Sequence, residues 1–550
     1  MNAKKYTILF VLFVLFALIL SACAAATPQS MVKTIVVEKE GQTVIQTVEV
    51  EKVVVVEEAS QVVVATQASS NEPSGYYAWP TATPGIAIPG TVPTPVDNYF
   101  QNYGVNPYVD AYEDHLSTFA LDVDTASYSV MRRYLQDGNL PPADAIRVEE
   151  FVNYFDPGYP TPPDIAFGIY ADGAPSPFAN DGSYLLRFGV QGYVVPEWER
   201  KPAILTFVID VSGSMQREQR LELVKQSLQI LVDRLHSDDS VSIVVYGSDA
   251  RVMLYPTAGS ERDTILRAIY SLKTEGATNA EAGLILGYDL AMRAYRNGAS
   301  NRVILCSDGV ANVGATGPDE ILSKVRGYVE EGVYLTTVGF GMGNFNDVLM
   351  EQLADNGNGS YAYVDDLDEA QKLFVEDLTA TLQVIALDAK IQVDFNPNVV
   401  AYYRLIGYEN RDVADQDFRN DAVDAGEIGA GHSATALYAV TFRPNADGRI
   451  ATVQLRWEDP DTHQVTEING NFNTWDLTPN FQEASPYYQL AVLAAQYAEV
   501  LRNSPWAYTT TLNQLSAMAQ PLRYSILESG EVNEFIDLLA RASQIWALGQ

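Results

Sequence analysis

Residues 203–364 alternate short apolar runs with amphipathic stretches, and few folds accommodate such an alternation. The first run, 204–209, carries no charge, which is typical of a strand buried on both faces. Strands that alternate with helices favour an α/β fold with a doubly wound, mainly parallel sheet. The strands are predicted at 204–209, 241–246, 252–254, 303–306, 333–338 and 361–364, and the helices at 219–235, 262–272, 276–295, 319–331 and 345–355.

Three polar clusters lie at the ends of these predicted elements. The first strand runs directly into the letters DVSGS, which contain Asp210, Ser212 and Ser214. Thr278 lies on the loop before a helix, and Asp308 follows the strand 303–306. In a doubly wound sheet, ligands bind beyond the carboxyl ends of the strands, where the loops converge. We therefore expect these side chains to meet at one edge of the sheet.

The side chains of the three clusters are all hard oxygen donors, two carboxylates and three hydroxyls. Such a set suits Mg²⁺ in octahedral geometry better than zinc or copper, with Mn²⁺ or Ca²⁺ as alternatives. Neutral hydroxyls leave the ion with residual positive charge. An acidic side chain of a partner can then complete the coordination through an open position.

The letters DVSGS, GATN and SDG, in this order and on these elements, resemble the metal-ion-dependent adhesion site (MIDAS) of von Willebrand factor type A domains. The alternative is a doubly wound domain whose loop residues only cap helices, as Ser and Asp often do. A single DxSxS occurs by chance, whereas three clusters in order are specific. The five positions of the motif are matched by Asp210, Ser212, Ser214, Thr278 and Asp308.

This resemblance implies a von Willebrand A domain at residues 202–379. It also implies that Asp210 and the two serines hold the ion, that Thr278 ligates it in one state, and that Asp308 acts directly or through water. The chain departs from the pattern at residues 215–217, MQR, where integrin-type domains place acids for a second calcium. That adjacent regulatory site is therefore not predicted.

Composition excludes several classes of protein. The chain has 550 residues and a formal charge of −35, and a field of that sign repels phosphate backbones, so nucleic acid is not an expected partner. Two cysteines and four histidines leave little material for zinc, haem or iron–sulfur chemistry and no disulfide framework. The acidity favours solubility, and acidic clusters that hold cations are the alternative.

Residues 1–23 resemble the export signal of a bacterial lipoprotein. Lys4 and Lys5 precede an apolar run at 8–20, which is short for a membrane-spanning helix. The run ends in LSAC, which resembles the lipobox, in which the thiol of Cys23 is lipidated and becomes the mature N-terminus. An ordinary cleavage site with a chance cysteine is the alternative. The expected location is extracytoplasmic, with a lipid anchor in the bacterial cell membrane.

A low-complexity stalk is expected at residues 24–97. Valine runs punctuated by Glu-Lys-Glu fill 33–58, and their β-branched content favours extended structure or self-association. Residues 59–97 are rich in Ser, Thr, Ala and Pro, which is typical of a linker. The stalk is expected to hold the rest of the chain away from the membrane.

The segments that flank the A domain are predicted to share one β-sandwich-like domain into which the A domain is inserted. Three edge-exposed strands after the A domain would make a poor core alone, so strands from both sides are expected to pair. The test is contact between residues 184–191 and strands beyond residue 389. In region 98–201, helices are predicted at 126–135 and 143–155 and strands at 165–170 and 184–191. In region 380–478, strands are predicted at 389–395, 436–442 and 450–457. In region 479–550, helices are predicted at 486–502, 508–518 and 532–546.

The flanks also carry a resemblance of their own. The letters ALDVDTASYSVMRRYL and RVEEFVNYFDP before the A domain resemble the N-terminal segment of a bacterial family of A-domain lipoproteins. YRLIGYENR and DAGEIGAGHSATALYAV resemble that family's C-terminal segment. The resemblance covers about residues 99–548, and it implies architecture and location rather than a biochemical role.

Other motifs hint at chemistry and are better explained by structure. LDVDT at 121–125 suggests the aspartate pair of phosphatases, but its threonine falls one place early, and a cap for helix 126–135 is the better interpretation. GFGMG at 339–343 lacks the spacing of a dinucleotide loop, so turn glycines explain it. Cys306 lies in a buried strand and is interpreted as a packed, inert thiol.

The leading hypothesis is therefore a membrane-anchored binding protein, not an enzyme, that uses Mg²⁺ to engage an acidic group of a protein ligand. An envelope assembly or scaffolding factor is the alternative, and it shares the metal site, so the sequence does not separate the two. A metal-assisted hydrolase is less favoured, because nothing in the spacing nominates a general base.

Overall fold

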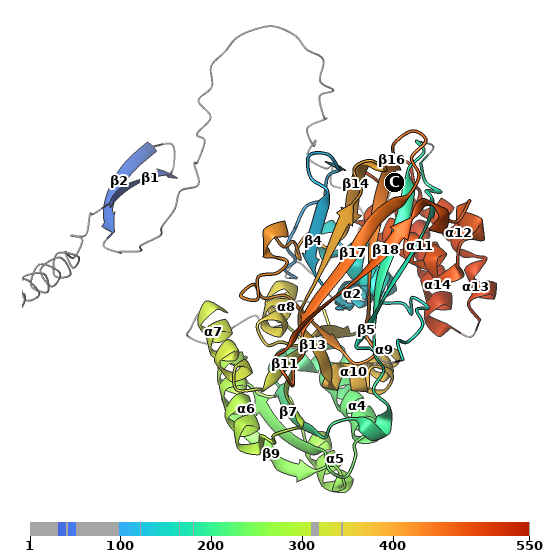
Figure 1. Cartoon of the computed structure of the whole chain (residues 1–550). Helices are drawn as coiled ribbons and strands as arrows, with labels where there is room; N and C mark the ends of the chain where they lie inside the picture. The colour runs from blue at the N-terminus through green and yellow to red at the C-terminus, as the bar shows by residue number, and fades with distance from the viewer. Residues whose placement is uncertain are drawn as a thin grey trace, which may run out of the picture. The chain divides into compact units, whose positions relative to one another are not determined.

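The computed structural model of the chain describes residues 31–39, 42–50, 98–121, 123–163, 165–179, 181–309, 318–342, 345–527 and 529–548. The chain divides into two compact units, residues 1–85 and residues 86–550, and each is described by itself (Figure 1). In the first unit, β1 (Met31–Lys39) and β2 (Gln42–Val50) form an antiparallel hairpin, in agreement with the extended structure expected there. The export signal with Cys23 and the linker at 59–97 lie outside the described residues.

The second unit contains the predicted α/β domain. Its sheet has the strand order β12-β11-β10-β7-β8-β9, in which β9 alone runs antiparallel to its neighbour. The predicted doubly wound, mainly parallel sheet is therefore confirmed. The strands are β7 (Ala203–Asp210), β8 (Ser240–Tyr246), β9 (Ala250–Ala258), β10 (Ser300–Ser307), β11 (Tyr334–Phe340) and β12 (Tyr361–Val364), and the helices are α4 (Arg220–Val232), α5 (Arg262–Tyr270), α6 (Ala280–Ala294), α7 (Pro318–Val329) and α8 (Asp347–Asp355).

The central strand of this sheet is buried on both faces, as its uncharged run predicts. Every residue of β7 is buried. Leu205 and Phe207 pack into one apolar cluster with α4, and Val208 packs into a second cluster with α6 on the opposite face. The helices therefore enclose the strands and leave the loops at the strand ends exposed, where a site can form.

A β-sandwich is built from strands on both sides of the α/β domain. One sheet has the order β15-β13-β17-β18 with β4 on β13, and the other has the order β3-β14-β16-β6-β5. β6 pairs with β16 from Ser433 opposite Gln191 to Val440 opposite Tyr184, which confirms the predicted pairing across the insertion. The strands are β3 (Val109–Asp110), β4 (Leu116–Ala120), β5 (Phe167–Pro175), β6 (Tyr184–Gly192), β13 (Val384–Phe395), β14 (Val400–Ile406), β15 (Gly426–Gly429), β16 (Ser433–Phe442), β17 (Arg449–Glu458) and β18 (Val465–Asn473).

Helices from the two flanks pack on the outer face of the sheet that contains β16. Tyr438 and Val440 of β16 enter the core between the sheets, whereas Leu437 and Ala439 enter a separate cluster with these helices. Within the described residues, no helix is long and apolar enough to cross a membrane. The helices are α2 (Ala126–Gln136), α3 (Val148–Asn153), α11 (Pro486–Leu501), α12 (Leu512–Ala519), α13 (Leu522–Ser525) and α14 (Gly530–Leu548), while α9 (Leu367–Gln371), η4 (Lys372–Glu376) and α10 (Leu378–Leu382) connect β12 to the sandwich.

Buried ion pairs join the N-terminal flank to the α/β domain. Arg132 on α2 donates hydrogen bonds to Asp365, which follows β12, and to Glu369 on α9. Arg147 donates to Asp347 on α8, with 2.6 Å between Nη1 and Oδ2. Arg132 of the segment MRRYL and Arg147 of the segment RVEEF therefore join the N-terminal flank to the α/β domain.

The interpretation of LDVDT as a helix cap is wrong in its detail. The helix α2 begins at Ala126 as predicted, but Thr125 makes no side-chain capping hydrogen bond. Asp124 instead accepts a hydrogen bond from the backbone N–H of Tyr361, at 2.9 Å, so this segment holds the first residue of β12. A contact of such long sequence separation leaves no local sequence signal.

Candidate metal centre

The carboxylate of Asp210 is held rigidly where β7 ends. Its Oδ1 accepts a hydrogen bond from the backbone N–H of Ser212 at 2.7 Å, and its Oδ2 accepts one from the hydroxyl of Ser307 at 3.2 Å. Asp210 is buried, and burial, reinforced by the nearby charge of Asp308, raises its pKa to about 6. A cation beside this carboxylate would relieve that cost of ionisation.

The structure brings four of the five sequence-predicted ligands together. The hydroxyl oxygens of Ser212 and Ser214 lie 2.9 Å apart, and the hydroxyl of Ser214 lies 3.1 Å from Oδ1 of Asp308. In an octahedron with metal–oxygen bonds of about 2.1 Å, neighbouring ligand oxygens are separated by about 3.0 Å. The distances from the Ser214 hydroxyl to Ser212 and to Asp308 therefore fit neighbouring positions of a Mg²⁺ coordination sphere.

Thr278 lies on a loop that contacts the segment between Asp210 and Ser214, and also Ser248. The N–H of Gly213 donates to the carbonyl of Gly276 at 3.3 Å, and the N–H of Ala277 donates to the hydroxyl of Ser248 at 3.0 Å. Within the described residues, no hydrogen bond joins the side chain of Thr278 to the other four ligands. The structure places Thr278 on the adjacent loop, as the resemblance implies, without engaging its hydroxyl.

Arg220 is a neighbour of the site that the sequence did not reveal. This arginine begins α4, is 3% exposed and donates from Nη1 to Oδ2 of Asp308 at 2.6 Å. Its Nη2 donates to the carbonyl of Met342, and its side chain crosses Gly341, where an added Cβ would collide with the guanidinium. The letters GFGMG therefore include a glycine needed for this crossing, with a φ of 83°.

The other groups of the site are hydroxyls, a buried thiol and exposed loop residues. Within the described part of the chain, no three His, Cys, Asp or Glu side chains converge as a metal cluster, so hydroxyls must supply part of any coordination sphere here. Cys306 is buried in β10, and burial raises the pKa of its thiol, in agreement with a packed, inert role. Gly213 and residues 216–219 are exposed and Ser214 and Thr278 are half-buried, so a partner has access to this edge.

Comparison with known proteins places three matches along the second unit. Residues 94–187 match the family model described as von Willebrand factor, and residues 205–376 match the von Willebrand factor type A domain. Residues 380–449 and 443–545 match the model described as "Uncharacterized protein YfbK, C-terminal". The matches therefore cover most of the unit, including parts of both flanks as well as the α/β domain.

Individual relatives agree with these matches. The protein YfbK of Escherichia coli (strain K12) is 35% identical over 492 residues, which cover 84% of this chain and 83% of that protein. A protein of Synechocystis sp. is 27% identical over 293 residues, or 52% of this chain and 68% of its own length. A solved structure, von Willebrand factor type A from Catenulispora acidiphila, is 16% identical with a TM-score of 0.41, covering 65% of this chain and 87% of that one.

Proposed function

We propose a metal-dependent binding function for this chain, which belongs to the bacterial family of von Willebrand factor type A domain proteins that includes YfbK of Escherichia coli. Domains of this type mediate protein–protein interaction. The proposal adds three specifics: a Mg²⁺ ion, with Mn²⁺ or Ca²⁺ as substitutes, a ligand set at the end of β7, and a carboxylate on the protein partner. It describes binding and not catalysis.

The spacing of the oxygens at the end of β7 is the observation that carries the proposal. The hydroxyl of Ser214 lies at the spacing of neighbouring octahedral ligands from the hydroxyl of Ser212 and from Oδ1 of Asp308, beside the fixed carboxylate of Asp210. When bound, the ion supplies a Lewis-acidic position that accepts an anionic oxygen of the partner. The residues of this chain hold and orient the ion, and the half-buried Thr278 is within the loop that borders it.

The proposed location is outside the cytoplasm, with the chain tethered through lipid on Cys23. The support is the sequence alone: a short basic start, an apolar run of signal-peptide length and the letters LSAC. A lipid anchor would confine the binding site to the neighbourhood of a membrane, so both envelope proteins and foreign surfaces are candidate partners.

Capture of partners from isolated envelope membranes tests this function. The purified full chain is expected to retain one or more membrane proteins in the presence of Mg²⁺ and to release them in chelator. The Asp210→Asn variant is expected to retain none of them under either condition. Capture that is the same with Mg²⁺, with chelator and with the variant would overturn the proposal, and the identity of captured proteins separates envelope assembly from adhesion.

Arg220 provides a second prediction, on the affinity of the site. Arg220→Gln is expected to raise the Mg²⁺ affinity about tenfold, because it removes a positive charge that is hydrogen-bonded to Asp308. Isothermal titration of the metal-free chain with Mg²⁺ measures this change. Arg220→Lys keeps the charge and is the matched control, with an affinity expected within about threefold of the natural chain. An unchanged or weaker affinity in Arg220→Gln would show that the guanidinium does not compete with the ion.

A further inference from the structure

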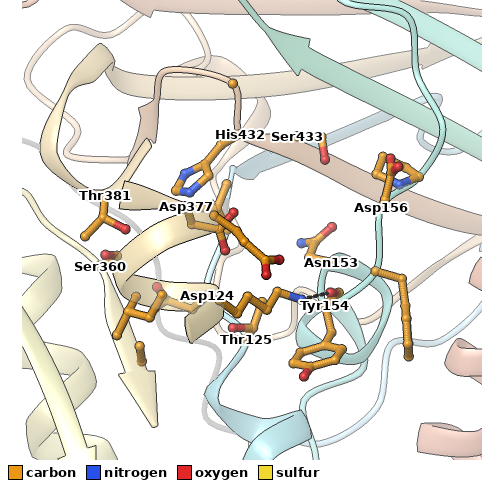
Figure 2. Close-up of a pocket in the computed structure, with 18 of the residues that line it drawn as sticks. Asp124, Thr125, Asn153, Tyr154, Asp156, Ser360, Asp377, Thr381, His432 and Ser433 are labelled. Carbon is orange, nitrogen blue, oxygen red and sulfur yellow. Dashed lines mark hydrogen bonds between the residues drawn. The ribbon is translucent and has the colours of Figure 1, made fainter. Parts of the chain in front are cut away.

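Three of the sequence segments that carry the family resemblance meet at one cavity, away from the residues of the metal centre. The cavity has a volume of about 290 Å³ and is lined by Asp124 and Thr125 of the letters DVDT, by residues 153–157 of the letters NYFDP, and by residues 431–433 of the letters GHS. Further walls come from β12 and the segment 372–381, from Gln191 of β6 and from Glu531 of α14. Figure 2 shows these side chains around a common space.

Several polar side chains of this cavity have no protein partner. Among the described residues, neither the carboxylate of Asp377 nor a ring nitrogen of His432 makes a hydrogen bond, and Nδ1 of His432 is fully buried. The hydroxyls of Thr381 and Ser433 also lack side-chain hydrogen bonds within the described residues. Buried polar atoms are normally hydrogen-bonded, so the unpaired Nδ1 of His432, beside a half-buried carboxylate and hydroxyls that also lack side-chain hydrogen bonds, indicates a place for a polar guest.

The charge of the walls is negative, although Asp124 also pairs with Arg411 at 3.6 Å. Asp124, Asp156, Glu376, Asp377 and Glu531 line the cavity, and Lys372 is the single lysine or arginine among its lining residues. Lys372 is already engaged, because its ammonium group donates to Glu531 at 2.6 Å and to the carbonyl of Tyr154 at 2.5 Å. Burial lowers the pKa of His432 to about 4, so its ring is neutral near pH 7 and does not offset the carboxylates.

Asp377 is a carboxylate of this cavity that is costly to ionise, so a cationic partner would stabilise its charged form. Burial raises its pKa to about 6, with Glu531 and Glu376 adding to the shift and Lys372 opposing it. Within the described residues no three acidic, histidine or cysteine side chains converge here, so the cavity offers a guest one or two charge contacts rather than a cluster of them. A small organic cation needs only one or two charge contacts and uses hydroxyl and ring acceptors for its other hydrogen bonds.

We propose that this cavity binds a small organic ammonium compound, with Asp377 as the charge partner and with His432, Thr381 and Ser433 as hydrogen-bonding groups. The apolar side chains of Phe155 and Leu373 would cover the carbon skeleton of the guest. The site is distinct from the metal centre, so it neither needs the ion nor depends on the function proposed above. Because the flanks and the α/β domain share its walls, an occupied cavity would join them more firmly.

Titration of the full chain with putrescine, in chelator and at pH 8, tests the proposal. At this pH Asp377 is ionised, and chelator removes any contribution from the metal centre. 1,4-Butanediol is the matched neutral probe, since hydroxyls replace its two ammonium groups. We expect calorimetry to show putrescine binding and an affinity for the diol at least about tenfold weaker, which is the size of one charge-assisted contact.

Two variants locate the binding. Asp377→Asn keeps the shape of the side chain and is expected to weaken putrescine at least about tenfold. Asp368→Asn removes the same charge from an exposed position on α9 outside the cavity lining, and its affinity is expected to stay within about twofold. The proposal would be overturned if neither putrescine nor ethanolamine gave binding heat at millimolar concentration. It would also be overturned if the diol bound as tightly as putrescine, or if both variants lost the same affinity for putrescine.

Discussion

Asp210→Asn is expected to lower the Mg²⁺ affinity of the chain at least about 100-fold, beyond the range of 10–100-fold that is usual when only a supporting residue is replaced. The substitution removes one of the two carboxylates of the proposed ligand set. An asparagine keeps the size of the side chain and an oxygen that accepts from the N–H of Ser212. A lower Mg²⁺ affinity would therefore be caused by the missing charge and not by a rearranged loop.

Thermal unfolding with and without Mg²⁺ measures this effect. An ion that binds only the folded chain at 100 times its Kd adds about 2.7 kcal/mol of stability, so the midpoint of the natural chain is expected to rise with Mg²⁺. The midpoint of Asp210→Asn is expected not to move. Asp249→Asn, at an exposed position in the turn after β8, changes the charge equally at the same edge and is expected to respond like the natural chain.

The variant Asp210→Asn is expected to be more stable than the natural chain when no metal is present. Asp210 is fully buried, and a second carboxylate, Asp308, lies in the same site. A neutral amide removes both the desolvation cost and the repulsion. A variant that is less stable in chelator and still responds to Mg²⁺ would contradict the assignment of Asp210 as a metal ligand.

Apolar periodicity predicted the α/β domain, and the strand pairing across it was predicted because the strands after the domain would make a poor core alone. β7 and β12 are recovered to within a residue at each end, because buried parallel strands read as uninterrupted apolar runs. β9 is longer than predicted, since an edge strand with exposed residues such as Tyr255 has a weaker apolar signal. β18 escaped prediction for the same reason: it ends its sheet, and most of its side chains are exposed or half-buried.

The site was predictable only where its residues follow directly from strand ends. Asp210, Ser212, Ser214 and Asp308 occupy such positions, so the topology alone brings them together. The position of the Arg220 side chain depends instead on a loop at Gly341, more than a hundred residues later in the chain. No local sequence pattern around Arg220 predicts this contact. The cavity beside His432 is built from segments equally far apart, and the one sequence signal for it is that three of them carry the family resemblance.

Arg147→Met is expected to destabilise the chain by about 3–5 kcal/mol, the usual cost when one partner of a buried ion pair is removed. Arg147 is 4% exposed and contacts Glu150, Asp347 and Glu351, which are 1%, 1% and 5% exposed. Methionine fills a similar length without charge, so three buried carboxylates would lose a shared counterion, and Glu351 alone would keep a second one, Arg411. Calorimetry is expected to show a midpoint lowered by roughly 3–5 °C.

A surface pair of the same kind is the matched control for this prediction. Arg523 is 32% exposed and pairs with Asp537, which is 73% exposed, at 2.6 Å. Exposed pairs contribute about 0–1 kcal/mol, so Arg523→Met is expected to leave the midpoint nearly unchanged. If the two variants unfold at the same temperature, Arg147 does not join the N-terminal flank to the α/β domain in the way that its contacts indicate.

The loss caused by Arg147→Met is also expected to be larger at pH 8 than at pH 6. Burial raises the pKa of Glu351 to about 7, and Arg147 and Arg411 oppose that shift. A carboxyl with a raised folded pKa contributes its stability at low pH and loses it as the pH rises through that value. Without Arg147 the pKa rises further, so ionised Glu351 costs more at pH 8, whereas at pH 6 the group is largely protonated in both chains. An equal loss at the two pH values would mean that Glu351 does not depend on Arg147 for its charge, and that Asp347 and Glu150 alone account for the effect.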